Sequence, residues 1–277
     1  MYNFLILGGD SRQLYLNQIL IKNGFQTTLH YSNEDSSFSM EEAMKNSNII
    51  LCPIPFTRDK INLFSDNNMD DLGIGNLLNL LTPDHILFGG SIPAYVKEYA
   101  RENGIAYFDY MDMEDITVKN TIATAEGAIA EAIRLSPGCL HKSKCLVTGF
   151  GRCAKTLALK LKGLDGAVTI AGRKETQLVQ ASSMGFHARA LCDLCPVIGN
   201  YEFIFNTIPA LIIEKELIQS MNPDVTIIDI ASAPGGVDFD SCRQQNIRAR
   251  LCPGLPGIYA PQSSAEILFE AIVKSLS

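Results

Sequence analysis

Short apolar runs alternate with helix-like segments along the whole chain. In the first half, the runs Phe4–Leu7, Asn48–Leu51 and His85–Phe88 each lead into a turn rich in glycine or proline. Between the first two lies Ser11–Asn23, which has the mixed polar and apolar pattern of a helix and stops before Gly24. Apolar strands that alternate with glycine-terminated helices are typical of parallel βαβ units. The pattern therefore predicts an α/β fold from the start of the chain.

A second series of strands begins at Lys144, after a helix expected over Thr124–Leu135 and a stop at Ser136-Pro137-Gly138. The expected strands of this series are Cys145–Thr148, Ala167–Ala171, His187–Arg189, Glu202–Phe205, Val225–Ile230 and Ile247–Leu251. The two series predict two tandem doubly wound parallel-sheet domains, residues 1–136 and residues 137–262. We expect the amphipathic helix of residues 263–277 to pack on the first domain. Because ligands of open α/β sheets bind beyond the carboxyl ends of the strands, we expect the two domains to share one site.

The second domain carries a dinucleotide-binding motif. Its first strand runs directly into Gly149-Phe150-Gly151-Arg152-Cys153-Ala154, and a helix is expected from Lys155. In this G-x-G-x-x-A pattern, Gly149 makes the tight turn, Gly151 lets the backbone approach a pyrophosphate, and Ala154 allows close helix packing. A turn without a ligand is the alternative reading. The strand, the helix and a second strand at the right distance favour a Rossmann NAD(P) site that includes Gly149, Phe150, Gly151, Arg152 and Ala154.

The residues after the second strand of this motif bear on the choice of cofactor. An NAD site would place Asp or Glu there to accept from the ribose hydroxyls. The sequence has Arg173 and Lys174 instead, which could pair with a 2′-phosphate. Two exposed cations at a helix start are the alternative. We favour NADP over NAD.

Three later strands of the second domain end in segments rich in glycine, proline and small polar residues. Such loops are where a Rossmann domain meets the nicotinamide ribose and ring. A turn alone could explain any one of them, but three in register favour contact with the ligand. The candidate cofactor-binding residues in these loops are Asn206, Thr207, Ile208, Pro209, Ala231, Ser232, Gly254, Leu255 and Pro256.

The first domain offers candidates for holding a substrate. Arg12 follows the Gly8-Gly9 turn, and its fork matches a carboxylate, although a surface cation is an equally good reading. Ser91 and Thr124 could donate hydrogen bonds to the same ligand. Thr124 is also a plausible helix N-cap, and Glu126 in the first turn would complement the helix dipole. We take Glu126 as the candidate catalytic residue for proton transfer.

Composition excludes several classes of function. Of 277 residues, 47% are apolar and 19% are charged, which suffices for two ordinary cores. A formal charge of −7 and a pI near 5.1 argue against nucleic-acid or anionic-membrane partners. No apolar run approaches the roughly 20 residues of a membrane span. The first nine residues resemble a strand and turn rather than a signal peptide, so we expect a cytoplasmic protein.

Eight cysteines are dispersed through the chain. Cys192-Asp193-Leu194-Cys195 has the spacing of half a zinc site, but no second pair exists and the four histidines show no metal-site spacing. We therefore expect cysteines that pack as small core residues, and no metal.

Taken in order, these motifs resemble those of the family formed by the A subunit of dipicolinate synthase, over nearly the whole chain. The segments that carry the resemblance are Gly8–Gln13, Thr124–Gly127, Gly149–Arg152, Asn206–Pro209, Asp229–Ser232, Pro234–Gly236, Asp238-Phe239, Pro253–Ile258 and Ala260-Pro261. Two positions depart from the pattern: Ala154 stands where glycine is usual, and Gly172-Arg173-Lys174 is more basic.

The resemblance implies an NAD(P)-dependent dehydrogenase that acts with the flavoprotein-like B subunit of dipicolinate synthase. Its substrate would be a dihydro- or tetrahydrodipicolinate from the lysine pathway, oxidised to dipicolinic acid during sporulation. Aromatisation would drive that reaction, so orientation could suffice for catalysis. Two alternatives stay open: another NADP-linked oxidoreductase of the shikimate or hydroxyacid dehydrogenase type, and a non-catalytic NADP-binding scaffold or regulatory protein. The sequence leaves homo-oligomerisation open.

Overall fold

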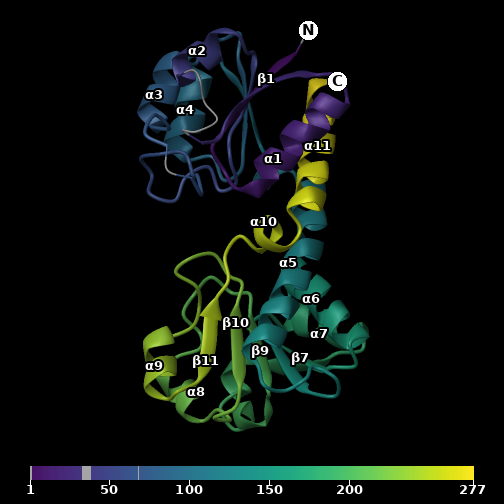
Figure 1. Ribbon diagram of the computed structural model, residues 1–277. Helices are drawn as coiled ribbons and strands as arrows, with labels where there is room; N and C mark the ends of the chain where they lie inside the picture. Colours follow the sequence, from purple (N-terminus) through teal and green to yellow (C-terminus); the bar gives the residue numbers. More distant parts are fainter. Residues whose placement is uncertain (1, 33–38, 68) are drawn as a thin grey trace. The chain divides into compact units, whose positions relative to one another are not determined.

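The computed structural model describes residues 2–32, 39–67 and 69–277, which form two compact units (Figure 1). The first unit contains the described residues up to Asn120 together with Ala260–Ser277, and the second is Thr121–Tyr259. The division lies inside one long helix, α5 (Glu114–Leu135). The boundary expected from the sequence, between residues 136 and 137, lies at the carboxyl end of that helix.

The first unit is built on a five-stranded parallel sheet with the order β2-β1-β3-β4-β5. Its strands are β1 (Asn3–Leu7), β2 (Gln26–His30), β3 (Ile49–Leu51), β4 (Ile86–Gly89) and β5 (Ala106–Asp109). Its helices, besides the start of α5, are α1 (Ser11–Lys22), α2 (Met40–Lys45), α3 (Ile74–Leu80), α4 (Ala94–Glu102) and α11 (Pro261–Leu276).

Both faces of this sheet are covered because side chains alternate along each strand. In β1, Phe4 and Ile6 join a core with α1 and α11, whereas Leu5 and Leu7 join a core with α2, α3 and α4. Helix α11 packs along α1, so the last residues of the chain complete the core of the first unit.

The second unit is built on a six-stranded parallel sheet with the order β11-β10-β9-β6-β7-β8. Its strands are β6 (Lys144–Thr148), β7 (Ala167–Gly172), β8 (His187–Ala190), β9 (Phe203–Asn206), β10 (Thr226–Asp229) and β11 (Arg248–Leu251). Its helices, besides α5, are α6 (Arg152–Gly163), α7 (Glu175–Ser183), α8 (Lys215–Gln219), α9 (Phe239–Gln244) and α10 (Leu255–Tyr259). The order reverses between β6 and β9, where dinucleotide-binding sheets have their switch point. The prediction of two doubly wound parallel sheets is confirmed.

Two predicted helix starts were wrong. Helix α5 begins at Glu114 rather than at Thr124, so Thr124 lies in the helix interior and is not an N-cap. The acidic residues Glu114 and Asp115 occupy the true first turn, where they complement the helix dipole. Helix α6 begins at Arg152 rather than at Lys155, because Gly151 already serves as its N-cap.

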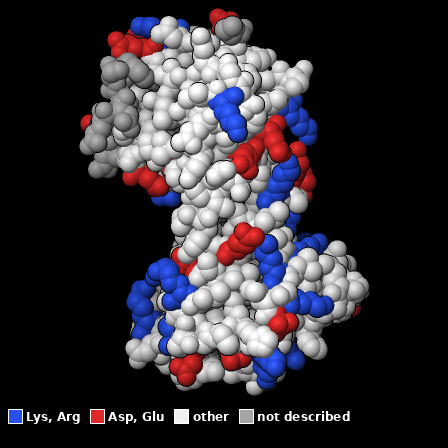
Figure 2. All heavy atoms as spheres, turned by 45° about the vertical axis from the view of Figure 1, so that its right-hand side comes forward, with Lys and Arg blue, Asp and Glu red and all other residues white. Residues whose placement is uncertain are grey.

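The surface carries charges of both signs. In the view of Figure 2, Lys and Arg side chains are interspersed with Asp and Glu. Among the helices that the structure describes, none is long and apolar enough to cross a bilayer. Within the described ranges, no group of three or more His, Cys, Asp or Glu side chains is arranged to hold a metal ion.

Candidate functional site

The turn from β6 into α6 has the backbone that the motif requires. Gly149 has a φ of +87°, in the left-handed region that favours glycine, and its N–H donates to the Ala171 carbonyl at 2.7 Å. A Cβ at Gly149 would lie 2.7 Å from the Thr207 hydroxyl oxygen. Conformation and space therefore both exclude a side chain, and the turn is held close to β7 and to the loop after β9.

The amino terminus of α6 fits a phosphate group. Its N-cap, Gly151, offers no side-chain capping bond, and a Cβ built there would meet no atom within 4 Å. The first N–H groups of a helix have no partners inside the helix and attract anions. Ala154 is fully buried, as the motif demands for close packing. The open side of Gly151 next to these N–H groups therefore suits the pyrophosphate of a dinucleotide.

The end of β7 carries positive rather than negative charge. Arg173 and Lys174 are both exposed, and neither side chain forms an ion pair or hydrogen bond within the described part of the chain. The first carboxylate after β7 is that of Glu175, in the first turn of α7. Two unneutralised cations thus stand where an NAD site would hold a carboxylate.

A buried polar network joins the ends of three neighbouring strands. The Thr148 hydroxyl donates to Asn206 Oδ1 at 2.6 Å, and Asn206 Nδ2 donates to Asp229 Oδ1 at 2.8 Å. All three side chains belong to residues that are 0% exposed. These residues end β6, β9 and β10, which lie side by side in the sheet. The network therefore links the turn after β6 to the loops after β9 and β10, which the sequence analysis expected to contact the cofactor.

Asp229 also binds the backbone of the loop that follows it. Its Oδ1 accepts from the Ala231 N–H at 3.0 Å and its Oδ2 from the Gly236 N–H at 2.7 Å. A Cβ at Gly236 would lie 2.5 Å from the carbonyl oxygens of Ile208 and Ala210, so the loops after β9 and β10 are in contact. Burial raises the pKa of the Asp229 carboxyl, and these hydrogen bonds oppose the rise.

The structure assigns distinct environments to the predicted loop residues. Ala231 is buried and Ser232 is exposed. Thr207 donates its hydroxyl to the Thr148 carbonyl at 2.7 Å, and Ile208 N–H donates to Asn206 Oδ1 at 3.1 Å. The Asn206 side chain therefore supports the loop from within. Sequence reasoning missed Thr148 and Asp229, although each is a polar residue at the end of an apolar strand.

The segment Pro253–Tyr259 packs against α5 at Gly127. A Cβ at Gly127 would lie 2.9 Å from both Leu255 Cβ and Tyr259 Cδ2, which explains a glycine inside this helix. Leu255 is a core side chain, 1% exposed, while Gly254 has a φ of +70°. The Tyr259 hydroxyl donates to Glu131 Oε1 at 2.7 Å, and that hydrogen bond raises the tyrosine pKa. Helix α10 is thereby fixed to α5.

Glu126 lies on the exposed surface of α5. Its Oε1 pairs with Lys160 Nζ of α6 at 2.7 Å, and its side chain is 57% exposed. Thr124, two residues earlier, is half-buried in the helix interior. Both residues thus stand on a continuous helix, and the local geometry around Glu126 is that of a surface ion pair.

Arg12 is already paired with a carboxylate of its own unit. Its Nε donates to Asp10 Oδ1 at 2.8 Å and its Nη2 to Asp10 Oδ2 at 2.6 Å, which is a bidentate pair. Nη2 also donates to the Ile54 carbonyl. The two side chains are only 8% and 12% exposed. Asp10 is at the same time the N-cap of α1, so the pair anchors the turn after β1.

The other first-unit candidates lie near the carboxyl edge of the sheet. Ser91 follows β4, is exposed, and has a φ of +58°; its N–H donates to Asp109 Oδ1 at 2.9 Å. A hollow of about 500 Å³ lies beside the Gly8-Gly9 turn, lined in part by Arg58, Phe64 and Ser65. The Arg58 guanidinium stacks 3.7 Å above the centre of the Phe64 ring.

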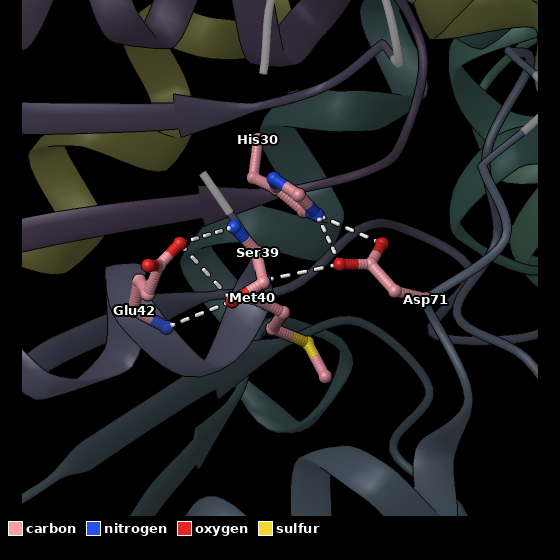
Figure 3. A network of polar contacts seen from close by, with 5 residues as sticks. All are labelled: His30, Ser39, Met40, Glu42 and Asp71. Carbon is pink, nitrogen blue, oxygen red and sulfur yellow. Dashed lines mark hydrogen bonds and ion pairs between the residues drawn. The ribbon is translucent and has the colours of Figure 1, made fainter. Parts of the chain in front are cut away.

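His30, which the sequence analysis weighed only as a possible metal ligand, is paired with Asp71. His30, at the end of β2, places Nε2 2.8 and 2.9 Å from the two carboxylate oxygens of Asp71 (Figure 3). Asp71 also accepts from the Met40 N–H at 3.0 Å, at the start of α2. Ser39 and Glu42 close this helix end as a capping box. The group joins β2, α2 and the loop that contains Asp71.

Comparisons by sequence find the same relatives for the first unit and for the chain as a whole. A family model, described as the N-terminal domain of the dipicolinate synthase A subunit, matches residues 3–111. The A subunit of dipicolinate synthase from Bacillus subtilis (strain 168) is 28% identical over 281 residues, covering 98% of this chain and 95% of that protein.

Solved structures give the same result. The crystal structure of the dipicolinate synthase A subunit from Bacillus halodurans superposes with a TM-score of 0.85 at 25% identity, covering 100% of this chain and 98% of that one. The corresponding Bacillus subtilis structure gives a TM-score of 0.82 at 26% identity, covering 99% and 95%. A transhydrogenase from Sinorhizobium meliloti shares the fold at 12% identity, with a TM-score of 0.65. The match covers 100% of this chain and 92% of the transhydrogenase chain.

Proposed function

Because the chain is similar over nearly its whole length to dipicolinate synthase A subunits, we propose that it is a member of that family and the NADP-dependent dehydrogenase that oxidises a partly reduced dipicolinate to the aromatic dicarboxylate. The proposal includes a partner, the second subunit of the synthase, and a role in sporulation, both taken from the family resemblance. The observation that carries it is the turn at Gly149–Gly151, which leaves open backbone at the amino terminus of α6.

The residues of the second unit fit the cofactor. The N–H groups at the start of α6 would hold the pyrophosphate, and Arg173 and Lys174 would pair with a 2′-phosphate. The loops after β9 and β10, fixed by Asn206 and Asp229, would line the nicotinamide side. When bound, the nicotinamide supplies a hydride acceptor. The protein's part is to orient the substrate, because aromatisation of the ring supplies the driving force.

We propose that a cation of the first unit holds the carboxylate of the substrate. The fork of Arg12 is occupied by Asp10, so we place the substrate on Arg58 instead. The Arg58 side chain is 59% exposed and stacks on Phe64, and its ion pair within the described residues is a long one, 4.0 Å to Asp66. An exposed guanidinium beside the turn after β1 can bind a carboxylate without breaking a buried pair. Glu126 keeps its surface ion pair with Lys160, and the proposed reaction includes no proton transfer by this residue.

Titration of NADP into the purified chain, wild type and Gly151→Val, tests the proposal. A side chain at Gly151 would stand in the open space beside the α6 amides, so NADP binding should be lost while circular dichroism stays unchanged. Gly163→Val, at the other end of α6 and equally free of neighbours within 4 Å, is the matched control. Retained binding by Gly151→Val would overturn the site. If the wild type binds NADP but does not turn over substrate when its partner is present, the proposed dehydrogenase activity is wrong and the chain is a non-catalytic NADP-binding scaffold.

A further inference from the structure

Asp229 is a buried carboxylate with neutral partners. The residue is 0% exposed, and its oxygens accept from the Ala231 N–H, the Gly236 N–H and Asn206 Nδ2. No Lys, Arg or His of the described ranges forms an ion pair with it. A buried charge without a counter-charge is costly, because hydrogen bonds from neutral groups offset only part of its desolvation.

The hydrogen bonds around Asp229 are those of the ionised form. All three partners are donors, and an ionised carboxylate only accepts. The loop backbone closes over the group, since a Cβ at Gly235 would lie 2.5 Å from Asp229 Oδ2. Burial raises the pKa of the Cys252 thiol, and the charges of Glu131 and then Asp229 add to the rise. The three donors thus suit a negative charge at the end of β10.

The position of this charge in the sheet bears on the ligand. A doubly wound dinucleotide sheet consists of two mononucleotide-binding halves. The phosphate turn and the cations Arg173 and Lys174 belong to the half made of β6, β7 and β8. Asp229 ends the middle strand of the other half, β9-β10-β11, which is left for the nicotinamide nucleotide.

We propose that Asp229 is a positioning residue whose buried charge makes the site prefer the oxidised over the reduced nicotinamide ring. The oxidised ring carries a positive charge and the reduced ring is neutral, so only the oxidised form offsets the uncompensated carboxylate. The inference rests on the proposed function and deepens it. It identifies a dehydrogenase poised to take up the oxidised cofactor and to release the reduced one.

The test measures dissociation constants by titration for NADP⁺, NADPH and 2′-phospho-ADP-ribose, which lacks the ring. Asp229→Asn removes the charge and keeps the shape. The ratio of the NADPH to the NADP⁺ dissociation constant should fall about tenfold, which corresponds to about 1.4 kcal/mol. Affinity for 2′-phospho-ADP-ribose should not change. Thr148→Val is the control, because it removes a hydrogen bond from the same network without changing charge and should leave the ratio unaltered.

The outcomes distinguish a failure of the proposed function from a failure of the role proposed for Asp229. If the wild type binds none of the three ligands, the proposed function fails. If Asp229→Asn weakens NADP⁺ and NADPH equally, Asp229 is merely structural and the inference is overturned. If this variant does not fold, the wild type still decides: NADP⁺ must bind more tightly than both NADPH and 2′-phospho-ADP-ribose. Tighter binding of NADPH would overturn the inference.

Discussion

Removal of Arg12 should destabilise the first unit rather than weaken substrate binding alone. Arg12→Ala leaves the Asp10 carboxylate, 12% exposed, without the two guanidinium bonds at 2.8 and 2.6 Å. Breaking a buried pair by removing one partner typically costs about 3–5 kcal/mol, because the other charge stays buried. The Ile54 carbonyl also loses a donor. We therefore expect a loss of about 3–5 kcal/mol, a large part of the usual 5–15 kcal/mol of domain stability.

The assay has to follow the first unit, because a chain of two units need not unfold in one step. Hydrogen exchange of the α1 amides, measured in increasing urea, reports on that unit. The single variants Asp10→Ala and Arg12→Ala and the double variant form a mutant cycle. Asp10→Ala should lose in addition about 1 kcal/mol as an N-cap, and the double variant should be less destabilised than the sum of the two. A stability of Arg12→Ala within about 0.5 kcal/mol of wild type, the usual range for a surface substitution, would refute the reasoning.

Three further predictions concern the second unit and the cysteines. Arg173→Ala should weaken NADP by about 1.5–3 kcal/mol and leave NAD unchanged in parallel titrations, the size of one charge-assisted hydrogen bond; equal loss for both cofactors would argue against a 2′-phosphate contact. Gly127→Val should cost about 1–3 kcal/mol in urea unfolding, because the new side chain meets Leu255 and Tyr259 at 2.9 Å, whereas Gly163→Val should lack this packing penalty. Burial raises the pKa of Cys145 and Cys252 to about 12, so both stay thiols at mildly alkaline pH and should resist iodoacetamide until the pH or denaturant is raised. Mass mapping should find early labelling at the exposed thiols Cys139, Cys192 and Cys195 instead.

The strands and the phosphate turn could be predicted from the sequence because their causes are local. Apolar runs between glycine-rich turns placed β1 and β6 within one residue, and Gly149 to Ala154 carry the phosphate turn in consecutive positions. The start of α5 was misplaced for a local reason too. Thr124 resembles a cap, but the residues before it, from Glu114 onward, are equally compatible with a helix.

The partners of polar side chains could not be predicted in the same way. Thr148, Asn206 and Asp229 are far apart in the sequence, and they meet only because β9 lies between β6 and β10 in the sheet. The Arg12 pair was missed for a different reason. Asp10 lies outside the helix as its cap, so the helical spacing rule for side-chain contacts does not apply to the pair.

The packing of α11 against α1 has a consequence for how the chain folds as it is synthesised. The first unit draws Leu268 and Ile272 into the core that contains Phe4 and Leu16, although almost the entire chain separates these segments. The second unit uses only the uninterrupted stretch Thr121–Tyr259. Contacts so distant in sequence close late, and chains emerge from the ribosome amino terminus first. The first unit is therefore completed only after the second unit has been synthesised, and until α11 emerges one face of its sheet is covered only in part, by α1 and its neighbours.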